Sequence, residues 1–174
     1  GYTLRIPTLN WYPVNGNPIN VALYPTNAGV VVDQLNFTYN TGAQYLILDG
    51  TSAGNVVNVV TVPTWLYVTK QGTSTWTWNA YASSYLMGDV LINGGNLIVN
   101  GALGVQSGRA VTLQSGTLHC NNPDALKTAL TITGGSLENS SGAPITTSPY
   151  NPAQNWNGNF AFNGSLGANS DLDL

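Results

Sequence analysis

Charged side chains are scarce in this sequence. Asp, Glu, Lys and Arg make up 6% of the 174 residues, whereas about a quarter is usual for a globular domain. The net charge is −3, and the basic residues are Arg5, Lys70, Arg109 and Lys127. So few cations cannot neutralise a row of phosphates, and we therefore expect no nucleic-acid partner.

Cysteine and long apolar runs are nearly absent as well. Cys120 is alone, which excludes an intramolecular disulfide and a zinc site built from several cysteines. No apolar run approaches the ~20 residues that a membrane-spanning helix needs. We therefore expect neither a disulfide framework nor a membrane span.

Side chains suited to catalysis are few. His119 is the one histidine, and it adjoins Cys120 in an expected strand, where neighbouring side chains point to opposite faces. The two therefore cannot easily form a nucleophile–base pair with each other. The seven acidic residues are scattered, which favours neither a glycosidase pair nor a calcium loop. We predict that the protein is not an enzyme and has no catalytic, cofactor-binding or metal-binding residues.

Amides and hydroxyls supply the polarity that charges do not. Asn, Ser and Thr total 53 residues, of which 22 are Asn, and Asn36, Asn139 and Asn163 each begin an Asn-x-Ser/Thr triplet. These three asparagines are possible acceptors of N-linked glycans. The chain starts at Gly1 rather than Met, as a secreted protein does after leader removal, although an artificial start would look the same. Together these features predict a glycosylated protein that is extracellular or at the cell surface.

Short runs of alternating apolar and polar residues, separated by Gly, Pro and Asn, predict an all-β fold. In the second half three segments share a strand–turn–strand form, and their glycines Gly95, Gly116 and Gly135 are 21 and 19 residues apart. This spacing fits the coils of a short β-solenoid and also fits tight hairpins, because both use the same turn residues. The first half lacks the period. We therefore predict an antiparallel β-sandwich of jelly-roll or pilin-like form, with the solenoid as the alternative.

The opening segment has the pattern of a strand with one apolar face. Tyr2, Leu4 and Ile6 alternate with polar residues, Pro7 interrupts the pattern, and Leu9 resumes it. Such a strand can pair within its own domain or complete the sheet of another copy. The Asn15-Gly16 pair predicts a local hairpin after it. We predict a donor strand or tail at residues 1–12 and a single sandwich domain at residues 13–174.

The Tyr2–Ile6 segment, the three glycosylation triplets and the charge-poor Asn/Thr/Tyr surface resemble the thread filament subunits of thermoacidophilic archaea. This resemblance extends over the whole chain through composition and layout. It implies a pilin-like β-sandwich linked by donor strand complementation, with residues 1 to about 12 as the donor strand. It also implies that Asn36, Asn139 and Asn163 carry glycans.

The predicted function is that of a structural subunit of an extracellular filament, with adhesion or cell–cell contact as its role. Copies would polymerise head-to-tail, because a donated strand makes a contact that does not close. The residues that would fill the groove of the next copy are Tyr2, Leu4, Ile6 and Leu9. Replacing both Leu4 and Ile6 by Asp is expected to leave a folded subunit that does not assemble.

Two other classes of function fit the sequence. One is a carbohydrate-binding adhesive module, in which Trp76, Trp78 and Trp156 would stack on surface glycans. For Trp76 and Trp78, a place in the core or in a subunit interface is the favoured interpretation, since aromatic residues dominate buried area. The other class is a viral coat or fibre protein.

Overall fold

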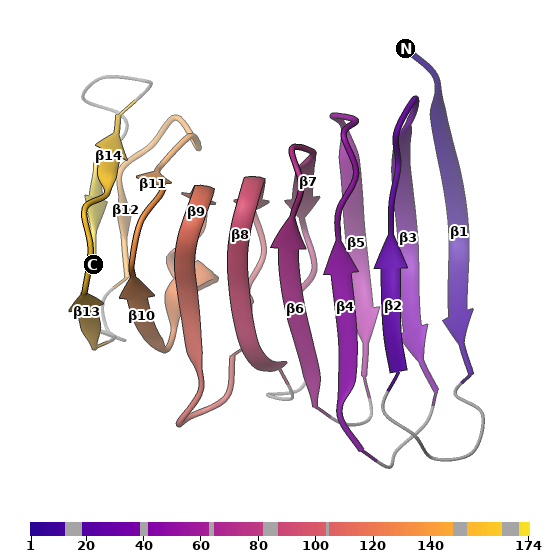
Figure 1. Ribbon diagram of the computed structural model, residues 1–174, viewed down its shortest axis with the longest axis horizontal. Helices are drawn as coiled ribbons and strands as arrows, with labels where there is room; N and C mark the ends of the chain where they lie inside the picture. Colours follow the sequence, from indigo (N-terminus) through magenta and orange to yellow (C-terminus); the bar gives the residue numbers. More distant parts are fainter. Residues whose placement is uncertain are drawn as a thin grey trace.

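The chain forms a parallel β-solenoid of about six turns (Figure 1). The computed structural model describes residues 1–12, 19–38, 42–62, 65–81, 87–103, 105–147, 153–164 and 171–174. Every strand pair within these residues is parallel. The antiparallel β-sandwich predicted from the sequence is therefore wrong, and the solenoid alternative describes the fold.

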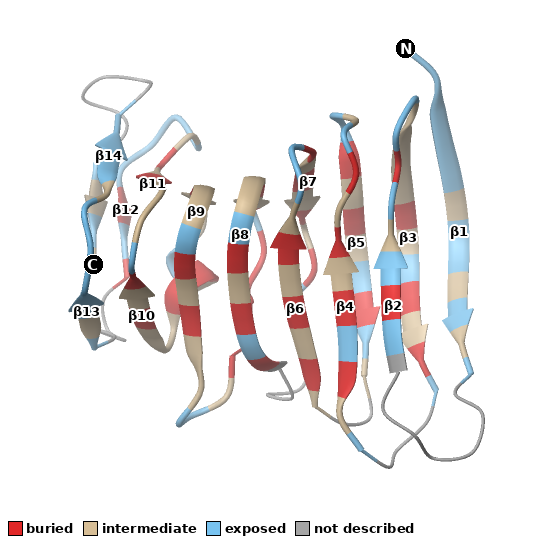
Figure 2. Ribbon diagram, viewed as in Figure 1, coloured by how far each residue is buried: buried red, intermediate tan, exposed pale blue. Residues whose placement is uncertain are grey.

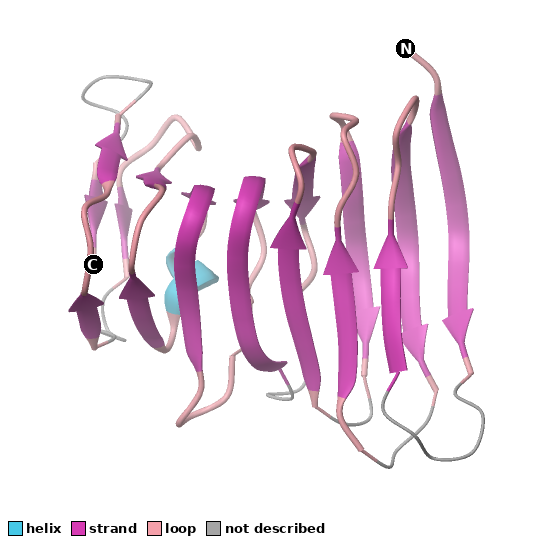
Figure 3. Cartoon of the chain, viewed as in Figure 1, coloured by secondary structure: helices cyan, strands magenta, loops and turns pink. Residues whose placement is uncertain are grey.

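Each coil contributes one strand to each of two faces (Figure 3). The first face contains, in order along the solenoid, β1 (Thr3–Trp11), β3 (Gly29–Phe37), β5 (Asn55–Thr61), β7 (Thr75–Trp78), the ends of β8 (Met87–Val99) and β9 (Ala110–Cys120), β11 (Ser136–Glu138) and β14 (Ala161–Asn163). The second face contains β2 (Ile19–Leu23), β4 (Gln44–Leu48), β6 (Leu66–Gln71), the beginnings of β8 and β9, β10 (Ala129–Ile132) and β13 (Gln154–Trp156). On a third side lie the 3₁₀ turn η1 (Pro123–Leu126) and the pair β12 (Ile145–Thr146) and β15 (Leu172–Asp173).

The length of the coils varies along the solenoid. Thr75 pairs with Asn96 and Asn96 with Thr117, so these coils contain 21 residues, and the next, from Thr117 to Ser136, contains 19. At the amino-terminal end Thr3 pairs with Gly29, 26 residues later. The longer first coils hide the period from the first half of the sequence.

Inward-facing side chains form rows along the axis. One row passes through Trp76, Leu97, Leu118 and Leu137, each at most 1% exposed. Because every second residue of a strand faces inward, the two faces enclose one apolar interior. Trp78 is also 1% exposed, so Trp76 and Trp78 belong to the core, and neither ring is available to stack on a sugar.

Tight glycine turns connect the second face of one coil to the first face of the next. Gly95, Gly116 and Gly135 have φ of +59°, +80° and +84°, and they stack directly on one another. A Cβ atom on Gly116 would lie 2.4 Å from the carbonyl oxygen of Gly95. The turns are those that the sequence predicts, but each joins strands of opposite faces instead of two paired neighbours.

The opening segment belongs to the main sheet of the solenoid. β1 pairs with β3, and β2 pairs with β4, so β1 and β2 do not form a hairpin with each other. The expected turn at Asn15-Gly16 lies outside the described residues. Among the described residues no helix is long and apolar enough to cross a membrane.

Candidate functional site

An asparagine ladder crosses four coils on the outside of the first face. Asn79 donates to Asn58 at 2.9 Å, Asn100 to Asn79 at 3.0 Å, and Asn121 to Asn100 at 3.1 Å. Asn58 in turn donates to Asp33 at 3.0 Å. These four asparagines, Asn58, Asn79, Asn100 and Asn121, are each 21 residues apart, a signal in the sequence that the glycine spacing alone did not reveal. In each coil of the ladder an asparagine amide makes a hydrogen bond to the asparagine of the neighbouring coil, and these bonds stabilise the stack of coils.

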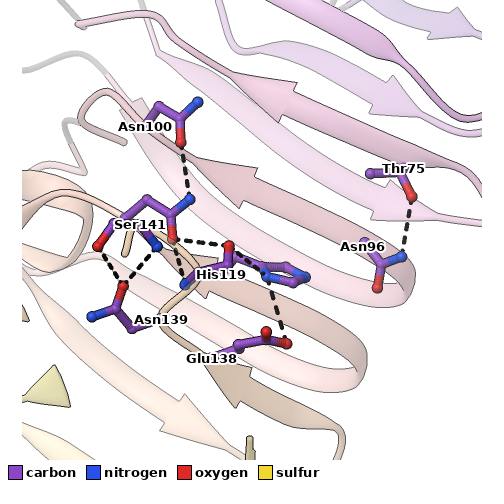
Figure 4. Close-up of polar contacts among 9 residues, drawn as sticks. Thr75, Asn96, Asn100, His119, Glu138, Asn139 and Ser141 are labelled. Carbon is purple, nitrogen blue, oxygen red and sulfur yellow. Dashed lines mark hydrogen bonds and ion pairs between the residues drawn. The ribbon is translucent and has the colours of Figure 1, made fainter. Parts of the chain in front are cut away.

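At the far end of the ladder lies a small polar cluster (Figure 4). The His119 Nδ1 atom is 3.1 Å from the Ser140 Oγ atom and 3.7 Å from a Glu138 carboxylate oxygen. Burial lowers the pKa of His119, and Glu138 partly opposes this effect. A catalytic triad needs its serine and its carboxylate at opposite nitrogens of the imidazole. Here both contact the same nitrogen, so the geometry is that of a structural hydrogen-bond cluster.

His119 and Cys120 point to opposite sides, as their adjacency in a strand predicts. Cys120 is completely buried in the interior, where burial raises the pKa of its thiol to about 12. His119 faces outward with 14% of its side chain exposed. The described residues contain no group of three or more His, Cys, Asp or Glu side chains that could hold a metal ion.

The three predicted glycosylation sites have different surroundings. Asn163 is exposed in β14, and Asn36 is half-buried with its amide donating to Asn10 at 2.9 Å. Asn139 is fully buried, and its side-chain nitrogen donates to the carbonyl oxygens of Ala143 and Asp171. A glycan on that nitrogen would remove one of the two donated hydrogens and would need space that the fully buried side chain does not have. The folded structure therefore accommodates a glycan at Asn163 and not at Asn139.

The amino-terminal end of the solenoid is an open strand edge. β1 pairs only with β3, and its other edge has no partner among the described residues. Tyr2 and Leu4 are 89% and 57% exposed, whereas Ile6 and Leu9 pack partly against the core. Of the four residues predicted for the donor-strand interface, two are therefore available and two already contact their own chain.

The carboxyl-terminal end is open in the same way (Figure 2). Within the described part of the chain β14 pairs only with β11 and β13 only with β10. Trp156 and Phe162 are 63% and 50% exposed. They border an open hollow of about 330 Å³ whose other lining residues are Leu137, Gln154, Phe160, Leu172 and Leu174. The apolar side chains at this end are of the kind that a further coil covers elsewhere in the solenoid.

A second aromatic group lies on the outside of the second face. Tyr45 and Tyr67 stack with ring centroids 5.1 Å apart. The Arg109 guanidinium lies 4.4 Å from the ring centroid of Trp65. These rings therefore already contact one another or an arginine of their own chain, and they do not form a free platform for sugar stacking.

One cation lies inside the solenoid. Lys70 is fully buried in an otherwise apolar row, and its Nζ atom donates to the carbonyl oxygens of Gln71 at 2.6 Å and Gly94 at 3.1 Å. Burial lowers the pKa of Lys70 from its usual 10.5 to about 8, an effect that nearby Asp49 only partly offsets. The folded state therefore releases this proton at a lower pH than the unfolded chain.

Stability should rise as the pH increases through this interval. Between pH 8 and 10.5 the unfolded chain binds more protons at Lys70 than the folded protein, and this difference favours folding as pH rises. We expect the free energy of unfolding to increase by about 1 kcal/mol between pH 7.5 and 9. Urea titrations at each pH would measure it, and the Lys70→Met variant should show no such increase. An equal increase in that variant would contradict the assignment.

No family model, no curated protein and no solved structure matches this chain.

Proposed function

We propose that this protein is a structural subunit of an extracellular surface filament in which solenoids stack head-to-tail. The observation that carries the proposal is that both end coils keep an unpaired strand edge and exposed apolar side chains among the described residues. Solenoid proteins normally protect their ends with polar capping repeats, and exposed strand edges recruit further strands. In a head-to-tail stack, each joint would cover the carboxyl-terminal end of one copy and the amino-terminal end of the next.

The solenoid changes how the copies are joined. Donor strand complementation inserts one strand of a subunit into a groove in the sandwich of the next. The predicted joint of this kind depended on a β-sandwich, which this chain does not form. In a solenoid the incoming copy instead adds a whole coil to the end of the stack. The outward faces carry amides and hydroxyls and leave Asn163 accessible, which supports a glycosylated filament with a role in adhesion or cell–cell contact.

Electron microscopy of the purified chain tests this proposal. We expect unbranched filaments whose long axis coincides with the solenoid axis. The first face contains eight strands, so each subunit should add about 38 Å at ~4.8 Å per strand. A protein that stays monomeric at high concentration would contradict the proposal.

A carbohydrate-binding module has less support from the described residues. Of the three tryptophans suggested for stacking, only Trp156 is exposed, and it lies at the end of the solenoid. A fibre of a virus particle would use the same open ends as a cellular filament. Glycan-array binding by a monomeric form of the protein would favour the carbohydrate-binding function.

A further inference from the structure

We propose that the joint between subunits is a parallel pair in which β14 of one copy adds to β1 of the next, with Phe162 against Leu4. This inference rests on the proposed function, and it specifies which strands of neighbouring subunits are in contact in the filament. The occupant of each open end is thus a second copy of this chain, held in the register that the solenoid already uses.

The strand register identifies the two partners. Leu4 pairs with Val30, and Phe162 pairs with Leu137. Both lie in the inward row that runs through Trp76, Leu97 and Leu118. Leu4 and Phe162 therefore occupy core positions, and they are exposed because no further coil covers them among the residues that the structure describes. If the register continues across a joint, Phe162 comes to lie next to Leu4.

The distribution of exposed apolar residues supports the same two surfaces. In the described part of the chain nine large apolar side chains are exposed, and six of them belong to the end coils. Those six are Tyr2, Leu4, Tyr12 and Tyr24 in the first coil, and Trp156 and Phe162 in the last strand of each face. Exposed apolar residues that cluster mark interaction sites, and most of these residues belong to the coils at the two ends of the solenoid. The strands at both ends are also largely exposed, whereas those between them are mostly buried or intermediate (Figure 2).

The lengths of the two edges also match. β14 has three residues, which would pair with Thr3, Leu4 and Arg5 and so end before Pro7, which has no N–H to donate. Translation along the axis keeps the two strands parallel. Arg5 is 70% exposed and already paired with Asp33, and in this register it would lie next to the uncharged Asn163, so the joint brings no like charges together.

Trp156 is exposed because the second face ends one strand earlier than the first face. The last strand of the second face, β13, lies one coil before β14, so β2 of the incoming copy would be two strand spacings, about 9.6 Å, from β13. Trp156 and Leu23 end the same inward row on this face. Trp156, which is 63% exposed at the end of that row, would face Leu23 across the joint.

Engineered disulfides can detect this register directly. Arg5 and Asn163 lie in one outward row at opposite ends of the chain. In the joint their Cα atoms would be about 5 Å apart, within the range that a disulfide spans. We expect the Arg5→Cys/Asn163→Cys variant to give a ladder of covalent multimers on non-reducing gels. Moving one cysteine along β1, in Thr8→Cys/Asn163→Cys, separates the pair by about 10 Å and should abolish the ladder.

A charge at the joint provides the second measurement. Leu4→Asp places a carboxylate opposite an aromatic ring without a partner, which should raise the concentration needed for assembly by at least roughly tenfold. Val59→Asp, which alters an exposed apolar residue in the middle of the solenoid, should leave assembly unchanged. Circular dichroism would verify that both variants fold.

The outcomes of these experiments distinguish a failure of the proposed joint from a failure of the proposed filament function. Filaments that form normally with Leu4→Asp and give no Arg5–Asn163 crosslink would overturn this joint and leave the proposed function standing. A wild-type chain that does not polymerise, together with an Arg5→Cys/Asn163→Cys variant that gives no ladder, would overturn both, as expected if other segments of a longer chain cover the ends. A register-specific ladder together with loss of assembly in Leu4→Asp supports the joint.

Discussion

Replacing Gly116 by alanine is expected to lower the free energy of unfolding by about 3–5 kcal/mol, through left-handed strain together with overpacking. Gly116 has φ of +80°, where an L-residue is strained, and its added Cβ would approach the Gly95 carbonyl oxygen to 2.4 Å. Glycines of neighbouring coils stack at this turn, so the backbone cannot move away without shifting the adjacent coils. Chemical denaturation followed by circular dichroism would measure the loss.

Gly108 supplies a matched control, because it has the same φ of +80° and no atom within 4 Å of the position that an alanine Cβ would occupy. Gly108→Ala should therefore cost only the conformational strain, about 1–2 kcal/mol. The difference between the two variants isolates the contact between stacked turns. Equal losses would mean that the coils are not packed together at Gly116.

The sequence predicts the strands and turns well, because both depend on local patterns. Alternation at period two and the glycines Gly95, Gly116 and Gly135 indicate short strands joined at sharp bends, and the structure contains these elements. Strand pairing is a non-local property, and a tight glycine turn serves a hairpin and a solenoid corner equally well. The 21-residue spacing of the ladder asparagines carried the missing information, since a period shared by glycines and by outward amides is not expected of unrelated hairpins.

The candidate contact residues were predictable in part. Exposure of Tyr2 and Leu4 follows from their place in an apolar strand at one end of the stack. Ile6 has the same alternation, yet it packs partly against the core, because burial depends on which neighbours the fold brings next to it. Phe162 could not be matched to Leu4 without the register, which only the three-dimensional structure provides.

The glycosylation triplets show the same limit of sequence-based prediction. The Asn-x-Ser/Thr motif can be recognised locally, but whether its asparagine is exposed depends on the fold. Asn139 falls in the inward row that continues from Cys120, and it is buried, whereas Asn163 is exposed. Both asparagines have the same acceptor motif. Only the stacking of coils distinguishes an asparagine that organises a buried loop from one that can carry a glycan.

Replacing Asn139 by aspartate is therefore expected to destabilise the fold by about 3–5 kcal/mol, because one oxygen of the buried carboxylate would face two acceptors. The other oxygen keeps the hydrogen bonds from the Ser141 N–H and Oγ–H groups, which offset only part of this cost. The side-chain nitrogen of Asn139 donates to the carbonyl oxygens of Ala143 and Asp171, and an aspartate oxygen would meet the same two acceptors. The substitution changes one atom type and almost no volume, so packing does not contribute to the loss.

The pH dependence of the Asn139→Asp variant identifies the cause. Burial next to two acceptors raises the pKa of such a carboxyl group, and its protonated form can donate one of the two lost hydrogen bonds. The destabilisation relative to wild type should therefore shrink as the pH falls from about 7 towards about 4. Asn163→Asp, at the exposed triplet, should change stability by less than about 0.5 kcal/mol, measured by urea denaturation of both variants. A loss at Asn139 that is independent of pH would show that the buried charge is not its source.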